Sequence, residues 1–501
     1  MKKPTKRDKH YVDPESKGRN LNRDWNRKTG LLFIALTTIC IFLSLAMILR
    51  AYHDKPVFPL GESYYSMRMA NTILDEGFIS KDPLQGTDYA PNPYHYLLSL
   101  LLLIFGSYFV LWFVPILLGV ASAWLFFKLL SGLGMGWEKA FYALLVLSVS
   151  PIFLVAFTGL YLIGWVLFIS LLSLVLLLPK NKLAKCLGIS CLIILVLSSL
   201  MGFIITFLGL LAIHVMLKKN PKALALHAII PLAALILAHI LLRQFPLIVG
   251  FGAFDFKDTL SLLGARFGFD LFLLLIFTIG FIVAWSSSKA TRLIHLAILF
   301  FIIFSFFNYV ARAFASLIVA YYCVIAITFL YRRNWSLEII KTGTMLLVLC
   351  SLVFSLANQL NLLVTSQPDE SLVKSIIFLE GLEDGIVLSD ESYGFLIEFY
   401  SGKQAFIDEN SFVLGDSYND KVTDFYALFN SVRITEAKPL LDKHSIRYVL
   451  ITPSMKEQLW ENNERGLWRL MKNSESFSKR YLEDDIEIRE YTPPIPEMPP
   501  V

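Results

Sequence analysis

Residues 30–49 read GLLFIALTTICIFLSLAMIL, twenty consecutive residues without a charged side chain. An α-helix needs about 20 mostly apolar residues to cross the hydrocarbon core of a bilayer. The run follows a basic stretch, as in a secretory signal. However, it is too long for the apolar region of a signal, and no small-residue cleavage site precedes Arg50–Lys55. We therefore predict that residues 30–49 form a retained first transmembrane helix.

Comparable apolar runs recur along most of the chain. Of the 501 residues, 56% are apolar and 17% are charged, whereas ordinary soluble domains have roughly 45–50% and 25%. This composition indicates an integral membrane protein and excludes a disordered chain, a disulfide-rich secreted module and a nucleic-acid-binding domain. All five cysteines lie in apolar runs, which predicts helix packing rather than a disulfide framework or a zinc site.

The charged residues divide the chain into segments. Residues 1–28 carry ten Lys or Arg and four Asp or Glu, residues 29–364 carry 21 and 11, and residues 365–501 carry 14 and 25. We predict a basic cytoplasmic tail at 1–28, a transmembrane domain at 29–364, a soluble domain at 365–492 and a loose Pro-rich tail at 493–501.

Lys and Arg concentrate in the cytoplasmic loops of membrane proteins, so the basic clusters predict the topology. After the N-terminal tail, these clusters lie at residues 180–185, 218–222, 289–292 and 332–341. The apolar runs between them predict about eleven spans, with a range of ten to thirteen, an N-terminus inside and the acidic domain outside. An outer loop at 54–93 is followed by an apolar surface stretch at 94–106 and a crossing at 108–130.

The soluble domain has the pattern of an α/β fold. Strand-like runs lie at 385–389, 404–407 and 446–451, and helical patterns lie at 419–430, 434–443 and 455–473. The predicted fold is therefore a polytopic α-helical membrane protein with a C-terminal extracytoplasmic α/β domain.

The outer loop contains the side chains best suited to chemistry. Glu62 is followed by two tyrosines and Arg68 on a predicted amphipathic helix at 63–76, which Gly77 ends, and Asp82 lies beyond it. A carboxylate at the outer membrane surface beside Tyr and Arg suits a general base or a ligand for a divalent cation. The alternative is that Glu62 is only a charge favoured by the dipole at a helix N-terminus.

The same loop resembles the first outer loop of GT-C membrane glycosyltransferases. It reads ESYYSMRMA from residue 62, followed by EGF, KDPL and PYHYL. This is most similar to the oligosaccharyltransferase catalytic subunit, where Asp-x-Tyr-Tyr-x-x-Arg precedes Gly-Phe and Asp-Pro. The leading Asp of that family is catalytic and binds a divalent metal, and Glu62 stands at its position here.

The resemblance implies a GT-C-like fold and a catalytic Glu62. It also implies that Glu62 and Asp82 are ligands for a divalent cation such as Mg²⁺ or Mn²⁺, and that Arg68, Asp82 and His95 bind or position substrate. Leu162 and Gly164 depart from the family, which carries an acidic pair there that supplies further metal ligands. This departure leaves three alternatives: an enzyme without a metal, remaining ligands from Asp255 or Asp258, or lost catalysis.

A second similarity concerns Arg312, in Tyr-Val-Ala-Arg-Ala-Phe-Ala-Ser-Leu. The family has an Arg near the outer end of its membrane domain that contacts lipid-linked phosphate, and a guanidinium suits phosphate oxygens. The alternative is interfacial placement of a long cationic side chain. Arg243 and Arg266 lie in an outer segment at 243–270, predicted to be either a phosphate-binding lid over the donor or a solvated loop of mixed charge.

A third similarity lies in the soluble domain. Asp390, Tyr393 and Gly394 stand in a stretch that resembles the family's Trp-Trp-Asp-Tyr-Gly motif, which reads the acceptor sequon, but both tryptophans are absent. A protein acceptor is therefore less strongly implied than a lipid or glycan acceptor.

The resemblance implies a transferase that moves a sugar or glycan from a polyprenyl-phosphate-linked donor to a protein, lipid or glycan acceptor on the extracytoplasmic face of the cell membrane. The alternative is a catalytically degenerate relative that binds lipid-linked glycan or assists envelope assembly. A transporter is disfavoured by the scarcity of charge in the apolar runs and by the large soluble domain.

Overall fold

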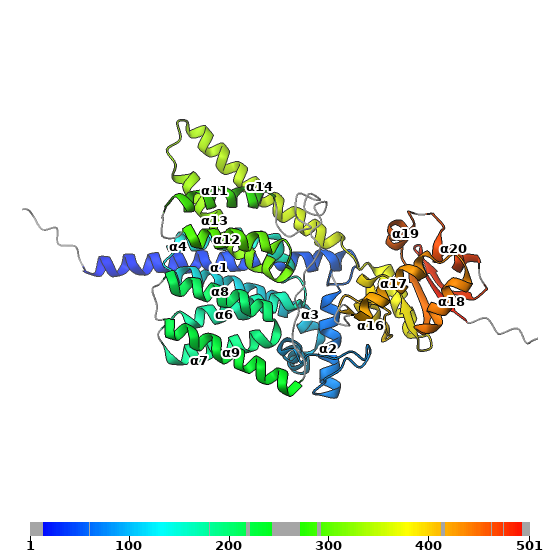
Figure 1. Cartoon of the computed structure of the whole chain (residues 1–501). Coiled ribbons are helices and arrows are strands. Elements are labelled where there is room, and N and C mark those ends of the chain that lie inside the picture. The colour runs from blue at the N-terminus through cyan, green and yellow to red at the C-terminus, as the bar shows by residue number, and fades with distance from the viewer. Residues whose placement is uncertain are drawn as a thin grey trace, which may run out of the picture.

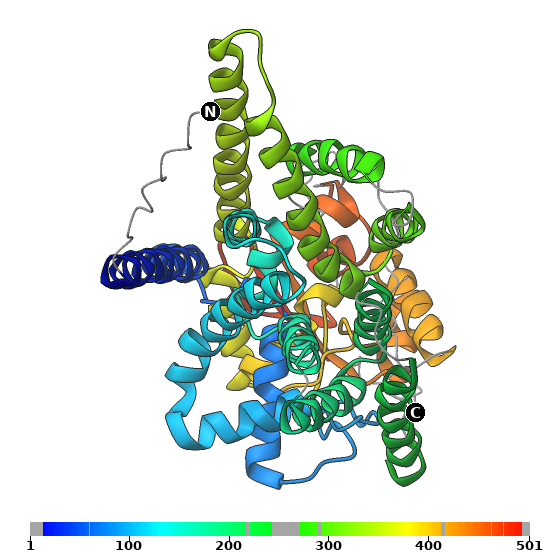
Figure 2. The ribbon, with the colours of Figure 1, turned by 90° about the vertical axis from the view of Figure 1, so that its left-hand side faces the viewer.

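The computed structural model describes residues 14–59, 61–179, 181–216, 221–242, 271–287, 292–411, 416–461, 463–473 and 475–492. A bundle of helices carries, at one end, a smaller domain that contains the sheet (Figure 1). Seen from the opposite end, the helices stand side by side with the C-terminal domain behind them (Figure 2). The chain is a polytopic α-helical membrane protein with a C-terminal α/β domain, which confirms the predicted fold class.

The helices of the bundle follow the predicted apolar runs. They are α1 (Pro14–Tyr52), α3 (Pro93–Gly132), α4 (Trp137–Ser148), α5 (Pro151–Ala156), α6 (Leu162–Leu177), α7 (Lys182–Ser198), α8 (Leu200–Met216), α9 (Pro221–Leu242), α11 (Leu271–Ser287), α12 (Arg292–Ser305), α13 (Tyr309–Arg332) and α14 (Glu338–Thr365). The helix α1 begins at Pro14, ahead of the apolar run at 30–49. Part of the basic N-terminal segment therefore belongs to the same helix.

Asparagine side chains set the start of two helices that matter for the site. Asn92 Oδ1 accepts a hydrogen bond from the Tyr94 N–H at the start of α3, and Pro93 occupies the first helical position. Asn308 Oδ1 accepts from the Ala311 N–H at the start of α13. Such a cap satisfies one of the N–H groups that a first helical turn leaves without an intrahelical partner.

The helix α3 is broken at Gly106, where φ is 77°. Glycine adopts positive φ at little cost because it has no Cβ. The break separates residues 93–105 from residues 107–132, and this confirms the division predicted between a stretch at 94–106 and a crossing at 108–130.

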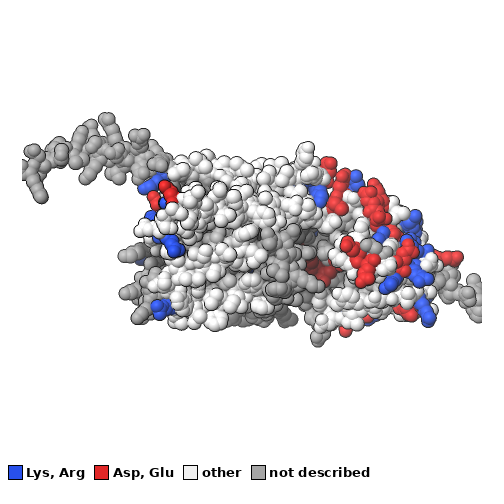
Figure 3. All heavy atoms as spheres, turned by 90° about the horizontal axis from the view of Figure 1, so that it is seen from above, with Lys and Arg blue, Asp and Glu red and all other residues white. Residues whose placement is uncertain are grey.

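By length and composition, four described helical stretches are suited to cross a membrane: Lys28–Tyr52, Pro93–Gly132, Tyr309–Arg332 and Glu338–Glu380. Shorter apolar helices are Leu162–Leu177, Leu200–Val215, Leu271–Ser286 and Arg292–Ser305. On the face shown in Figure 3, the side of the bundle carries almost no charge, and charged side chains gather at its far end and on the C-terminal domain. An uncharged side of this kind suits a surrounding bilayer. The number of about eleven spans stays a prediction.

The C-terminal domain is built on a four-stranded sheet of order β1-β2-β4-β3, in which β1 pairs with β2 in parallel and the other pairs are antiparallel. The strands are β1 (Ile386–Leu388), β2 (Ile446–Ile451), β3 (Phe477–Glu483) and β4 (Ile486–Tyr491). The helical segments are α15 (Glu370–Glu380), η2 (Glu391–Tyr393), α16 (Gly394–Ser401), α17 (Asp416–Asn430), α18 (Ile434–Lys443), α19 (Pro453–Trp460) and α20 (Gly466–Asn473).

Three details of this domain differ from the sequence prediction. The run at 404–407 forms only a single bridge, between Ala405 and Val387, rather than a strand. The helix expected at 455–473 is two helices, α19 and α20, because the chain turns through positive φ at Glu461. The hairpin of β3 and β4 was missed, although its two turn residues, Asp484 and Asp485, are of a type that tolerates the positive φ they adopt.

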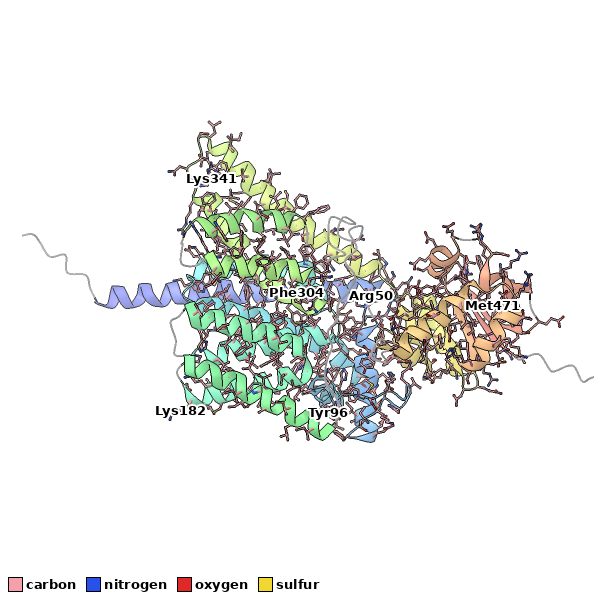
Figure 4. All side chains as sticks on the ribbon, in the orientation of Figure 1. Arg50, Tyr96, Lys182, Phe304, Lys341 and Met471 are labelled. Carbon is pink, nitrogen blue, oxygen red and sulfur yellow. The ribbon has the colours of Figure 1, made fainter. Side chains whose placement is uncertain are left out.

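Arg50 joins the bundle to the C-terminal domain. It lies in the last turn of α1, next to that domain (Figure 4), and is 1% exposed. Its guanidinium donates to the carbonyl oxygens of Pro56, Phe58, Leu363, Ser366 and Pro368, at 2.7 to 3.3 Å. One buried side chain therefore connects α1, the loop that follows it, and the segment that links α14 to α15.

Candidate functional site

The helix α2 (Glu62–Glu76) lies across the end of the bundle, beside the C-terminal domain (Figure 1). It packs on α3 of the bundle and on α16 of the C-terminal domain. The helix predicted at 63–76 is confirmed, and Gly77 ends it with φ at 82° and an N–H that bonds to the Ile73 carbonyl. Glu62, the first residue of α2, therefore lies where the two parts of the molecule meet.

Glu62 faces the N-terminus of a second helix. Its Oε1 accepts a hydrogen bond of 2.8 Å from the Leu162 N–H, which is the first N–H of α6. Burial raises the pKa of Glu62 from 4.5 to about 7, and the hydrogen bond from Leu162 acts in the opposite direction without cancelling this effect. A carboxylate whose pKa lies near neutrality can accept a proton at physiological pH.

The family that the outer loop resembles carries acidic residues at the positions of Leu162 and Gly164, which here lie in the first turn of α6. The Leu160 N–H donates to Ser63 Oγ at 3.0 Å, so the segment before α6 is held against the start of α2. A Cβ at Gly159 would lie 2.5 Å from Ser63 Oγ, and a Cβ at Gly164 would lie 2.3 Å from the Ala156 carbonyl oxygen. An acidic side chain at Gly164 therefore does not fit, and the N–H of Leu162 contacts Glu62 instead.

A second carboxylate near Glu62 comes from the C-terminal domain. Glu409 lies in a turn after α16 and the bridging residue Ala405, within electrostatic range of Glu62. The pKa of Glu409 is raised to about 7, chiefly by desolvation and in smaller part by the negative charges of Glu62 and Glu391. Acidic side chains are visible in a recess between the bundle and the C-terminal domain (Figure 3). Sequence reasoning did not single out Glu409, because only the tertiary contact brings it to Glu62.

Arg312 lies one turn into α13, whose first residue, Tyr309, interacts electrostatically with Glu62, Arg312 and Glu409. The Arg312 guanidinium is partly buried and donates to the carbonyl oxygens of Ser305 at 3.4 Å and Phe306 at 3.3 Å. Because Tyr309 interacts electrostatically with both Glu62 and Arg312, these two charged residues belong to one region of the molecule.

Arg68 and Asp82, both predicted to bind substrate, are paired with each other. The two guanidinium nitrogens donate to the two carboxylate oxygens of Asp82 at 2.7 and 2.6 Å, and Arg68 Nη2 also lies 3.0 Å from Glu398 Oε2 of α16. Burial tends to raise the pKa of Asp82, but the hydrogen bonds from Arg68 and from backbone N–H groups hold it below its ordinary value. The three residues form a buried contact between α2, the loop that follows it and α16 of the C-terminal domain.

Glu398 is the second carboxylate of this contact, and the sequence analysis did not identify it. An acidic residue within the apolar stretch Gly-Phe-Leu-Ile-Glu-Phe-Tyr could have indicated a buried carboxyl group. Gln85 donates a hydrogen bond to its Oε1. Burial raises the pKa of Glu398 from 4.5 to about 8, against the opposing charge of Arg68. Because the carboxylate of Asp82 already neutralises Arg68, a second negative charge on the buried Glu398 is unfavourable. With a pKa of about 8, Glu398 is mainly protonated at pH 7.

This proton makes stability depend on pH. Folded Glu398 binds a proton between about pH 4.5 and pH 8 that the unfolded chain does not bind, so stability falls as pH rises through this range, by about 1.4 kcal/mol per pH unit. We expect Glu398→Gln, which mimics the protonated side chain, to lower the slope in thermal unfolding by about this amount. The loss should be clearest between pH 7 and pH 8, because Glu62 and Glu409, with pKa values of about 7, add a slope of the same sign at lower pH. Glu380→Gln, at an exposed site, is the control. An unchanged slope in Glu398→Gln would show that Glu398 is charged.

Three predicted site residues remain: His95, which the structure describes, and Arg243 and Arg266, which it does not. His95 is buried at the start of α3, where its Nδ1 lies 2.8 Å from the Tyr89 hydroxyl and its ring packs edge-on against Tyr65. Arg243 and Arg266 lie outside the described residues, as does the whole segment at 243–270. Their substrate-binding roles, like that of His95, stay predictions.

The described residues provide few ligands for the divalent cation that the resemblance implies. Among them, no group of three or more His, Cys, Asp or Glu is placed to hold a metal. Both oxygens of Asp82 are bonded to Arg68, so Asp82 is not available as a partner ligand for Glu62. Glu62 and Glu409 alone fall short of the several oxygen ligands that Mg²⁺ or Mn²⁺ takes, and we derive no chemical step through a metal.

The residues that resemble the family's acceptor-reading motif have local structural roles. Asp390 Oδ1 accepts from the Ser392 N–H at the start of η2. Tyr393 is buried and its hydroxyl lies 3.4 Å from Thr452 Oγ1. A Cβ at Gly394 would lie 2.6 Å from the Cβ of Asp408, which precedes Glu409. This glycine therefore permits the close approach of the turn that carries Glu409.

No family model matches the sequence, and no curated protein matches it. Solved structures do match. Archaeal oligosaccharyltransferase AglB from Archaeoglobus fulgidus, in complex with an inhibitory peptide and a dolichol-phosphate, has a TM-score of 0.60 at 16% identity, over 95% of this chain and 75% of that chain. The same organism's oligosaccharyltransferase, tethered with an acceptor peptide containing the NVT sequon, has a TM-score of 0.61 at 16% identity, over 86% and 69%.

A third similar structure is ArnT from Cupriavidus metallidurans bound to undecaprenyl phosphate. It has a TM-score of 0.56 at 13% identity, and the match covers 93% of this chain and 99% of that chain. The similarity thus extends over the bundle and the C-terminal domain together. This chain has the fold of the GT-C membrane glycosyltransferases.

Proposed function

We propose that the protein is a membrane glycosyltransferase that moves a sugar or glycan from a polyprenyl-phosphate-linked donor to an acceptor on the extracytoplasmic face. The observation that carries the proposal is Glu62, a carboxylate with a pKa of about 7 at the junction of the bundle and the C-terminal domain. The structures of similar fold hold dolichol-phosphate or undecaprenyl phosphate, which supports a lipid-linked donor.

The proposed reaction is a nucleophilic substitution at the anomeric carbon. An acceptor O–H or N–H group attacks this carbon, the bond from carbon to the phosphate oxygen breaks, and the electron pair leaves with the polyprenyl phosphate. Glu62, as a general base, takes the acceptor proton. Arg312 stabilises the negative charge that develops on the leaving phosphate. Arg68 and Asp82 act as positioning residues, because they hold the outer loop against Glu398.

The proposal includes an orientation. Basic residues at the end of the bundle away from the C-terminal domain favour a cytoplasmic location for that end, with the N-terminus inside and the C-terminal domain outside. Glu62 and Arg312 then face the outer leaflet, where a lipid-linked donor can reach them. Reporter fusions at residue 420 test this orientation, and a cytoplasmic signal from them would overturn it.

The function is tested by mass spectrometry on the whole protein extracted in mild detergent. We expect a polyprenyl-phosphate-linked sugar to copurify, and we expect polyprenyl phosphate to be released when candidate protein, lipid or glycan acceptors are added. Absence of both the lipid and the release would overturn the proposal.

The second candidate function is a catalytically degenerate protein that binds lipid-linked glycan. It is favoured by the small number of carboxylates that the described residues bring to Glu62. The two functions differ in one result of the same experiment, because a binding protein retains the lipid and never releases polyprenyl phosphate.

Replacing Arg312 tests donor binding. We expect Arg312→Ala to weaken the affinity for a polyprenyl-phosphate lipid by about 10- to 100-fold, the loss typical of a charged hydrogen bond, measured by lipid binding in nanodiscs. Arg292→Ala, at the start of α12, is the matched control, because Arg292 is exposed. Equal affinity in the wild type and Arg312→Ala would leave Arg312 as an interfacial anchor.

A further inference from the structure

We infer that a cavity between α4, α11 and α13, at the end of the bundle away from the C-terminal domain, binds the headgroup of an anionic phospholipid. The inference does not depend on the proposed reaction, and it shares with the proposed function only the orientation that places this end of the bundle in the cytoplasm. The position follows from the chain path. The helix α14 ends at Thr365 near Arg50 and the C-terminal domain, so its start at Glu338 and the preceding end of α13 lie at the far end. Figure 4 shows Lys341 and Lys182 at this end and Arg50 at the other.

The cavity has a volume of about 350 Å³, within the range of ligand pockets. It is lined by Lys139 at the start of α4, Val283 of α11, Ile325, Thr328, Phe329 and Arg332 of α13, and Arg333. The four residues of α13 are spaced by three and four positions, so they lie on one face of that helix. Ile325 and Phe329 are apolar, Thr328 carries a hydroxyl group and Arg332 carries a guanidinium group. This face of α13 therefore has an apolar part and a cationic end.

The cationic end lacks an anion within the described part of the chain. Lys139, Arg332 and Arg333 converge on the cavity, and no described carboxylate lines it or pairs with them. Arg333 stacks on Trp335 at 5.4 Å, which leaves its donors available. The Thr328 hydroxyl is buried and has no hydrogen-bond partner among the described residues. Three positive charges and an unused hydroxyl donor around one cavity fit a phosphate group.

The apolar lining points to a lipid rather than to a soluble phosphate compound. Val283, Ile325 and Phe329 line the same cavity, and Phe329 is 41% exposed on the side of the bundle. A soluble anion gains nothing from these side chains, whereas a phospholipid covers them with its acyl chains and places its phosphate among the cations. Basic pockets between transmembrane helices on the cytoplasmic side recognise anionic lipids in this way.

The experiment uses the full chain in nanodiscs made from equal parts of phosphatidylglycerol and phosphatidylcholine. Native mass spectrometry after release from the nanodisc measures which lipid stays bound. We expect phosphatidylglycerol to be retained in excess, and we expect the double variant Lys139→Gln, Arg332→Gln to lose about fivefold of this retention for each cation removed. The control Lys182→Gln, Lys185→Gln removes two positive charges from α7, at the same end but outside the cavity.

Three results would overturn the inference. Equal retention of the two lipids would mean that the cavity does not select an anionic headgroup. An equal loss in the control would assign the preference to the general charge of this end. Displacement of the lipid by glycerol phosphate would assign the cavity to a soluble anion. Thermal unfolding in pure phosphatidylcholine checks that the variants fold, and in wild type alone phosphatidylglycerol is expected to raise the melting temperature.

Discussion

Replacing Glu62 by Gln is expected to lower the turnover number by on the order of 10³-fold, within the 10²- to 10⁴-fold range for the loss of a general base. The amide has the same shape and can still accept the hydrogen bond from the Leu162 N–H, so α2 and α6 should keep their contact. The variant loses only the proton acceptor and the negative charge. We therefore expect donor binding to persist, and a polyprenyl-phosphate-linked sugar to accumulate on Glu62→Gln in mass spectrometry.

The pH dependence separates a base from a structural carboxylate. Glu62 must be deprotonated to act, and its pKa is about 7, so wild-type turnover should fall about tenfold per pH unit below this value. Glu409→Gln removes a neighbouring negative charge. This change favours the charged form of Glu62 and should move the acid limb of the profile to lower pH.

The control for Glu62 is Glu76→Gln, at the exposed end of the same helix, which should leave turnover unchanged. Turnover of Glu62→Gln equal to the wild type would remove Glu62 from the chemistry. An acid limb that does not respond to Glu409→Gln would show that the two carboxylates are not coupled.

Replacing Arg50 by Ala is expected to lower the free energy of unfolding by more than about 3 kcal/mol, because each buried carbonyl left without a donor costs about 1–3 kcal/mol. Arg50 donates to five carbonyls, three of them in buried hydrogen bonds, in the loop after α1, in the last turn of α14 and in the segment that links α14 to α15. The C-terminal domain should then separate more readily from the bundle. Limited proteolysis between Thr365 and Glu370, together with thermal unfolding, measures both effects.

Two variants show whether the hydrogen bonds or the charge of Arg50 matters. Arg50→Lys keeps the charge but cannot reach the same set of carbonyls with a single ammonium group, so it should recover only part of the stability. Lys55→Ala removes a nearby, partly exposed cation whose hydrogen bond to the Thr365 carbonyl is exposed, and it should have little effect. A loss in Lys55→Ala as large as that in Arg50→Ala would contradict the role of Arg50.

The sequence determined the membrane class, the position of most helices and the outer helix that begins near Glu62. These features depend on local patterns: apolar runs of bilayer length, a glycine at a helix end, and an abrupt change of composition near residue 365. The break at Gly106 was predictable for the same reason, since the apolar stretch before it was too short to cross a bilayer.

Only the tertiary structure decided which charged groups meet. The sequence predicts that Arg68 and Asp82 bind substrate, and folding pairs them with each other and adds Glu398 from a position more than three hundred residues away. Glu409 comes within electrostatic range of Glu62 only because the C-terminal domain packs on α2. The energy of a charge depends on its burial and on its neighbours in space, and a local sequence pattern contains neither quantity.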